Sequence, residues 1–329
     1  MTAPVARARC AASSSRVQVV ARWTAISVGN VGKVTRVATV AINGVDIFYE
    51  ETGEGFPIVW CHEFAGDYRS WTPQVRYFAR LYRNVTWNCR GYPPSGVPED
   101  PTAYSQEHLV ADLLGLLDYL QIAQAHLVGL SMGGSLVLAF ALAHPERCRS
   151  IVAAGAGSGT TGRERFERDV HQVADTLLTQ GMATLAATYA RGPTRQPFLR
   201  KDPHGWQEFH DQFAGHSARG SAYTFLGVQL KRPTIYDLKP RLPGLRVPTL
   251  ILIGDEDEPC VEPAVFLKRE IPRAGLAVFP QSGHTLNLEE PAAFNAAVRD
   301  FLQQVETGRW ATRQEVSTSM LPWETRGEA

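Results

Sequence analysis

The chain has 329 residues, of which 44% are hydrophobic and 20% charged, a composition that excludes a disordered or fibrous protein. The 33 lysines and arginines balance 33 aspartates and glutamates. This balance argues against nucleic-acid binding, because that affinity depends on neutralising phosphates. No apolar run approaches the roughly 20 residues that cross a bilayer, so we expect no membrane association.

The N-terminal stretch is rich in arginine and serine, and its first acidic residue is Asp46. Transit peptides share this composition, but no apolar core or A-x-A cleavage pattern accompanies it. We therefore expect residues 1–37 to form a poorly structured arm.

The first predicted elements are strands. Residues 40–49 alternate around Asn43-Gly44, which predicts a β-hairpin. Residues 57–61 form a short apolar run typical of a buried strand, residues 70–81 have helical spacing, and residues 84–87 predict a further strand.

From Ser105, a plausible helix N-cap, helical and strand patterns alternate. A helix is predicted to run to about Leu120, and another over residues 134–143. Strands are predicted over residues 125–129, 150–154, 248–253 and 276–279. Such alternation predicts an α/β fold with a mostly parallel sheet covered by helices on both faces.

Residues 157–245 interrupt this alternation with helix-like sequence, so we expect a helical cap inserted between two strands. The core would then comprise residues 38–156 and 246–306, followed by a short polar tail, 307–329. The aromatic residues Trp206, Phe209 and Phe213 have helical spacing and are expected to pack inward.

The cap also carries an excess of positive charge. Residues 160–241 contain 12 lysines and arginines against 8 acidic residues. This excess would favour an anionic substrate, although charged surfaces usually just face water. The residues that could supply it near an entrance are Arg163, Arg165, Arg168, Arg191, Arg195, Arg200 and Lys201.

The strongest motif is G-x-S-x-G, centred on Ser131, between a predicted strand and a predicted helix. This context is the one a nucleophile elbow requires, since the sharp turn tolerates only small neighbours. A serine nucleophile needs a base. Of nine histidines, His284 alone follows a late strand through a glycine turn and precedes a helix.

A carboxylate must orient that histidine, and the turn after Gly254 offers four: Asp255, Glu256, Asp257 and Glu258. The order of serine, acid and histidine is that of an α/β-hydrolase triad. The residues themselves leave the choice among the four open.

With these motifs, residues 40–305 resemble the α/β-hydrolase superfamily, and this resemblance implies an α/β-hydrolase fold. The resemblance implies that the orienting acid is Asp257, the third residue after Gly254. The family's histidine motif, G-H-x(4)-E-x-P, is matched at Gly283, His284, Glu289 and Pro291. A degraded form of a second family motif, D-x-R-G-x-G-x-S, lies at residues 88–95.

The resemblance also implies two oxyanion-hole donors, the backbone N–H groups of Met132 and Phe64. Phe64 belongs to a loop that reads His62-Glu63-Phe64, where the family usually has H-G-x. Glu63 could reshape the loop or bring negative charge to the site, but we expect it to face solvent, because glutamate is rarely buried.

The leading hypothesis is a cytoplasmic serine hydrolase that cleaves small carboxylic esters through an acyl-enzyme. Alternatives are a carbon–carbon bond hydrolase of meta-cleavage products, an enol-lactonase or a perhydrolase, and a non-catalytic ligand receptor on the same fold. Ser131 argues against the dehalogenases and epoxide hydrolases of the superfamily, which use aspartate at the elbow.

No cofactor or metal is expected, since the sequence has neither a P-loop nor a complete dinucleotide-binding fingerprint. The cysteines, Cys10, Cys61, Cys89, Cys148 and Cys260, are scattered, odd in number and without C-x-x-C spacing. They predict buried or incidental thiols rather than disulfides or a zinc site. The oligomeric state stays open, a homodimer included.

Overall fold

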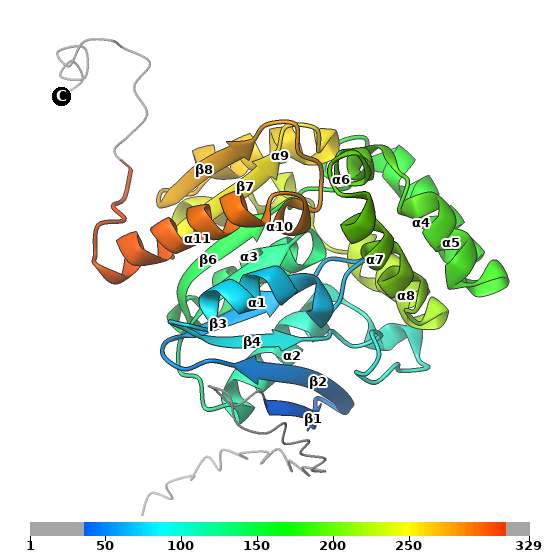
Figure 1. Ribbon diagram of the computed structural model, residues 1–329, viewed down its shortest axis with the longest axis horizontal. Coiled ribbons are helices and arrows are strands. Elements are labelled where there is room, and N and C mark those ends of the chain that lie inside the picture. Colours follow the sequence, from blue (N-terminus) through cyan, green and yellow to red (C-terminus); the bar gives the residue numbers. More distant parts are fainter. Residues whose placement is uncertain (1–35, 314–329) are drawn as a thin grey trace, which may run out of the picture.

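An eight-stranded sheet runs through the computed structural model, which describes residues 36–313 (Figure 1). The strand order is β1-β2-β4-β3-β5-β6-β7-β8. The two pairs β1–β2 and β2–β4 are antiparallel, and every other neighbouring pair is parallel. The strands are β1 (Arg36–Ile42), β2 (Val45–Thr52), β3 (Pro57–Cys61), β4 (Arg83–Trp87), β5 (Ala125–Leu130), β6 (Cys148–Ala154), β7 (Thr249–Gly254) and β8 (Ala274–Phe279).

Helices cover both faces of this sheet, as the alternating pattern predicts. On one face, α1 (Thr72–Phe78) and α11 (Pro291–Glu306) bury Trp60 and its neighbours. On the other face lie α2 (Gln106–Tyr119), α3 (Met132–Ala143) and α9 (Glu258–Glu270). The central strands β5, β6 and β7 are buried on both sides along almost their whole length, which explains why apolar residues predominate in them.

Element boundaries differ from the predicted ones by a few residues. The hairpin turns at Asn43-Gly44 as predicted, but β1 begins at Arg36, inside the predicted arm; residues 1–35 of that arm lie outside the described residues. The helix predicted over residues 70–81 is a 3₁₀ turn, Tyr68–Trp71, followed by the shorter α1. Ser105 caps α2 as predicted, accepting a hydrogen bond from the His108 N–H at 3.2 Å.

The segment between β6 and β7, here called the insertion (residues 157–245), consists of helices and turns. Figure 1 shows its helices grouped at one end of the sheet. Trp206, Phe209 and Phe213 are buried, which confirms that they pack inward. The helices are α4 (Arg163–Gln180), α5 (Met182–Tyr189), α6 (Gln196–Lys201), α7 (Pro203–Ala214) and α8 (Ala218–Thr224).

Residues 307–313, the first part of the predicted polar tail, form no helix or strand but contact the core. The Trp310 indole N–H donates to the Arg273 carbonyl at 2.8 Å, and its ring lies 4.6 Å from the Phe301 ring centre. Arg313 donates to the Lys268 carbonyl at 2.6 Å. Trp310 is half-buried against the core, a contact that a single tryptophan in an aperiodic stretch does not indicate in the sequence. Residues 314–329 lie outside the described part.

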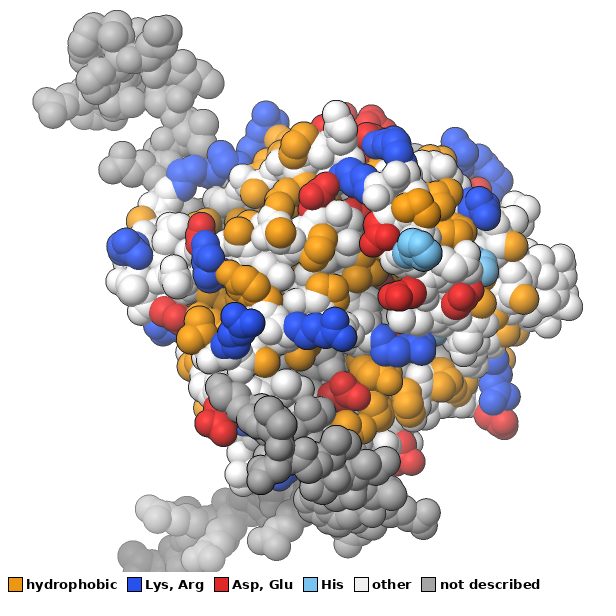
Figure 2. Space-filling model, viewed as in Figure 1, with side chains coloured by type: hydrophobic (Ala, Val, Ile, Leu, Met, Phe, Trp, Pro, Cys, Tyr) orange, Lys and Arg blue, Asp and Glu red, His pale blue; other side chains and the backbone are white. Residues whose placement is uncertain are grey.

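Charged side chains of both signs are interspersed on the face shown in Figure 2, with apolar side chains between them. Within residues 36–313, no helix is long and apolar enough to cross a membrane. The described cysteines, Cys61, Cys89, Cys148 and Cys260, are free and buried, while Cys10 lies outside the described residues.

Candidate active site

Ser131 lies at the turn between β5 and α3, with φ 55° and ψ −108°. A serine rarely adopts this conformation, and such strain concentrates at functional sites. The turn is closed by the Ser131 N–H, which donates to the Ala154 carbonyl at 2.8 Å. A side chain at Gly133 would overlap the backbone of Cys61, so this glycine lets α3 approach β3 closely.

His284 and Asp257 meet at the same edge of the sheet. The first follows β8 and the second follows β7, and the ring Nδ1–H of His284 donates to the Asp257 carboxylate at 2.7 Å. Gly155, which follows β6, is adjacent to both: a side chain there would lie 3.5 Å from Asp257 Oδ2 and from His284 Cε1. Ser131, Asp257 and His284 thus follow the carboxyl ends of β5, β7 and β8, which are parallel strands at one edge of the sheet.

Burial distinguishes the four candidate carboxylates. Asp257 is 1% exposed and contacts His284, whereas Asp255, Glu256 and Glu258 are exposed. The Asp255 carboxylate accepts the Ser282 N–H at 3.2 Å instead, and so supports the histidine loop from outside.

Glu289 is the acidic residue of the histidine motif, and its contacts show what that residue does. Its carboxylate accepts hydrogen bonds from the Gly283 N–H at 2.7 Å and from the Thr285 N–H at 2.9 Å. These two residues flank His284, so Glu289 holds the loop that carries the histidine.

The expected oxyanion donors belong to two buried residues, Met132 at the start of α3 and Phe64 in the loop after β3. His62 fixes that loop: its Nδ1 lies 2.7 Å from the Glu63 carbonyl, and its Nε2 accepts the Cys89 N–H at 3.0 Å. The ring is therefore a neutral tautomer with one donor and one acceptor. Burial agrees with this, lowering the pKa of His62 to about 4.

The expectation that Glu63 faces solvent is wrong. Glu63 is 2% exposed, and its carboxylate forms a two-pronged ion pair with Arg195 of the insertion, in which Arg195 Nη1 donates at 2.9 Å and Nη2 donates to the second oxygen. Burial alone lowers the pKa of Arg195, but the Glu63 carboxylate more than compensates and raises it above its usual value. The ion pair offsets the free-energy cost of burying these two charged side chains.

No local pattern in the sequence indicates this partner, because Arg195 lies 132 positions further along the chain. The same short segment contacts the histidine loop: the Thr194 carbonyl accepts the His284 N–H at 2.9 Å. The insertion thus contacts both the loop after β3 and the histidine loop through the consecutive residues Thr194 and Arg195.

An aromatic cluster covers this region. The Phe64 ring centre lies 3.9 Å from that of Phe225, 5.9 Å from Phe213 and 5.7 Å from Tyr189. The last three belong to the insertion, so the insertion packs aromatic rings around Phe64.

Most of the arginines and lysines expected to attract an anion are paired. Five of the seven named residues form ion pairs, and Arg195 is buried rather than at a surface entrance. The pairs are Arg163–Glu167, Arg165–Asp169, Arg195–Glu63, Arg200–Glu256 and Lys201–Glu290.

Within the described residues, Asp257, Cys260 and His284 offer metal-ligand atoms within 4.8 Å of one another. Desolvation raises the pKa of the Cys260 thiol well above its usual value, with Asp257 adding to the effect. A protonated thiol is a poor metal ligand, and Asp257 is already bonded to His284. The cluster therefore suits hydrogen bonding better than metal binding.

Comparisons with known proteins agree with this geometry. Residues 57–291 match the family described as alpha/beta hydrolase fold. 3-Oxoadipate enol-lactonase 2 of Acinetobacter baylyi is 27% identical over 248 residues, which are 75% of this chain and 88% of that protein. Because the family match covers well over half of the chain, the protein belongs to the α/β-hydrolase family. Two solved structures are also similar to it. They are the enol-lactonase of Burkholderia xenovorans LB400 (28% identical, TM-score 0.70, covering 80% of this chain and 99% of that one) and a malate-bound thermophilic esterase of Thermogutta terrifontis (27% identical, TM-score 0.72, covering 84% and 99%).

Proposed function

We propose that the protein is a serine hydrolase that cleaves carboxylic esters of small molecules through an acyl-enzyme. The observation that carries this proposal is the hydrogen bond between His284 Nδ1 and Asp257, at the sheet edge where Ser131 is held in a strained elbow. That bond leaves Nε2 of His284 without a proton, as a general base requires.

In the proposed reaction, Ser131 Oγ attacks the ester carbonyl while His284 takes its proton. The negative charge on the carbonyl oxygen is stabilised by the N–H groups of Met132 and Phe64. His284 then donates the proton to the departing alcohol, and a water molecule activated by the same histidine releases the acid and regenerates Ser131. Asp257 stabilises the charged imidazole, and the insertion acts as a cap that shields the site.

An enol-lactonase is the second candidate, favoured by relatives of that name in both sequence and structure. A lactone is an internal ester, so the same residues would open its ring. The esterase relative is similar to the same extent, and the identities do not separate the two substrates.

The first experiment measures hydrolysis of p-nitrophenyl acetate by the wild type, Ser131→Ala and Ser135→Ala. Ser135 is a buried serine one helical turn further along α3 and serves as the matched control. We expect Ser131→Ala to lose at least about 10³-fold in kcat, since the nucleophile is gone, and Ser135→Ala to retain activity. Activity that survives in folded Ser131→Ala would contradict the proposal.

The preference for anionic substrates stays a prediction. A neutral ester and its carboxylate-bearing analogue are compared at low salt, where unscreened charge has the greatest effect. A higher kcat/KM for the anionic ester, falling as salt is added, is the expected result. Equal values for both esters would show that the surface charges of the insertion serve no steering role.

A further inference from the structure

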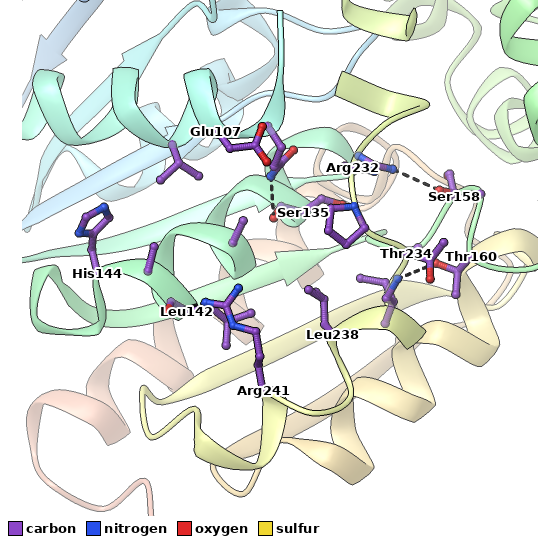
Figure 3. Close-up of a pocket in the computed structure, with 18 of the residues that line it drawn as sticks. Glu107, Ser135, Leu142, His144, Ser158, Thr160, Arg232, Thr234, Leu238 and Arg241 are labelled. Atoms are coloured by element: carbon purple, nitrogen blue, oxygen red, sulfur yellow. Dashed lines mark hydrogen bonds between the residues drawn. The ribbon is translucent and has the colours of Figure 1, made fainter. Parts of the chain in front are cut away.

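A cavity of about 350 Å³ lies between α2, α3, the loop after β6 and residues 232–241 (Figure 3). This volume is within the range of small-molecule sites. Ser131, Asp257 and His284 are not among the residues that line it. The cavity is therefore separate from the candidate active site.

The cavity walls are largely apolar. Figure 3 shows the side chains of α2, including Glu107, opposite Leu238 and Arg241, with His144 at one end and Arg232 and Ser158 at the other. The apolar lining includes Val110, Leu114, Ala139, Leu142, Ile235 and Leu238. An occupant with an apolar body would fit against these walls.

Arg232, at one end of the cavity, is a buried cation that forms no ion pair with any acidic residue in the described part of the chain. It is 8% exposed, and its Nη2 donates to the Ser158 carbonyl at 3.2 Å. Within residues 36–313, its Nη1 has no hydrogen-bond partner. Burial lowers the pKa of Arg232 to about 10, so the group still carries its charge at neutral pH. An uncompensated buried charge is costly, and a bound anion would compensate it.

The other charged side chains around the cavity form an ion pair or a hydrogen bond, or are exposed to solvent. Arg163 pairs with Glu167 at 2.8 Å, and Arg241 donates to the Leu142 carbonyl at 3.0 Å. Glu107, the one carboxylate that lines the cavity, is exposed. Positive charge thus dominates at the Arg232 end.

We propose that this cavity binds an organic monoanion with an apolar body, such as a medium-chain carboxylate, whose carboxylate pairs with Arg232 while its chain lies between α2 and α3. The site goes beyond the proposed ester hydrolysis and does not depend on it. At its Arg232 end, the Ser158 hydroxyl lies 3.5 Å from Sγ of Cys260, a residue three positions after Asp257.

The test is calorimetric titration of the full chain with octanoate and with the neutral octanamide. The titration is repeated after treatment with a serine-directed phosphonate, and the variants below locate the binding whether or not Ser131 reacts. We expect octanoate to bind at least about tenfold more tightly than octanamide, because only the carboxylate pairs with the guanidinium. No octanoate binding, or equal affinity for both compounds, would overturn the proposal.

Three variants locate the site. Arg232→Gln should weaken octanoate binding at least about tenfold and leave octanamide binding unchanged. Ala139→Trp, which keeps Arg232 but fills the cavity from α3, should abolish binding of both. Arg246→Gln removes an exposed arginine outside this cavity and should leave both affinities within about twofold. Octanoate binding that persists in both folded Arg232→Gln and folded Ala139→Trp would place the ligand elsewhere and refute the proposal.

Discussion

At the scale of single residues, burial decides which of several similar groups has a role. Four carboxylates follow β7 within four positions, and only Asp257 is turned inward to His284. Asp255, two positions earlier, stays exposed and accepts a backbone N–H of the histidine loop. Their chemistry is identical, so their different positions in the turn account for their different contacts.

Asp257→Asn should lower kcat of ester hydrolysis by about 10³- to 10⁴-fold with little change in KM. The amide cannot accept the Nδ1 proton in the same way, so the ring loses the tautomer in which Nε2 is the base. The change is read from steady-state kinetics, with Asp255→Asn as the control that removes a neighbouring exposed charge. Full activity of Asp257→Asn would assign the orienting acid elsewhere.

At the scale of elements, the insertion and the core are joined where the site's loops meet. Arg195 pairs with Glu63 of the oxyanion loop, and the adjacent Thr194 accepts the His284 N–H. The Arg195 guanidinium also lies 5.2 Å from the Phe209 ring centre, so α7 helps to hold it. A shift of this segment would therefore disturb both loops.

Glu63→Gln should lower the free energy of unfolding by about 3–5 kcal/mol, because it leaves the buried Arg195 charge unpaired. Urea denaturation measures the change. The control is Glu256→Gln, which breaks the exposed pair with Arg200 and should cost at most about 1 kcal/mol.

The double variant Glu63→Gln/Arg195→Met removes the unpaired charge as well, so it should be more stable than Glu63→Gln alone. If Glu63→Gln were no more destabilising than Glu256→Gln, the buried pair would have no structural role. A lower kcat in folded Glu63→Gln is also expected, since Glu63 directly precedes the proposed donor Phe64.

At the scale of the whole molecule, buried neutral histidines make stability depend on pH. Burial lowers the pKa of His62 to about 4, below the unfolded value near 6.5, and burial also lowers the pKa of His126. The unfolded chain therefore binds more protons than the folded one in this range. Stability is fully present above pH 6.5 and is lost as pH falls towards 4.

Between pH 7 and pH 5, the His62 contribution alone should decrease by about 2 kcal/mol. Thermal and urea unfolding at both pH values measure the loss. His62→Gln keeps a donor and an acceptor but does not titrate, so its stability should decrease less over the same interval. An unchanged pH dependence in His62→Gln would show that other groups cause it. Asp67 does not interfere, because its ion-paired carboxylate has a lowered pKa and titrates below this interval.

The sequence by itself determined the sheet, its helical layers and the elbow at Ser131, because periodicity and turn residues act over a few neighbouring positions. It also marked His284 and placed the orienting acid among four residues. Tertiary structure alone decided which acid contacts His284 and that Glu63 pairs with Arg195. It also decided that Arg232 is buried and that, among residues 36–313, its Nη1 has no hydrogen-bond partner. Those outcomes depend on contacts between segments far apart in the chain. Burial determines the free-energy cost of a charged side chain, and a side chain is buried only after those segments have packed together.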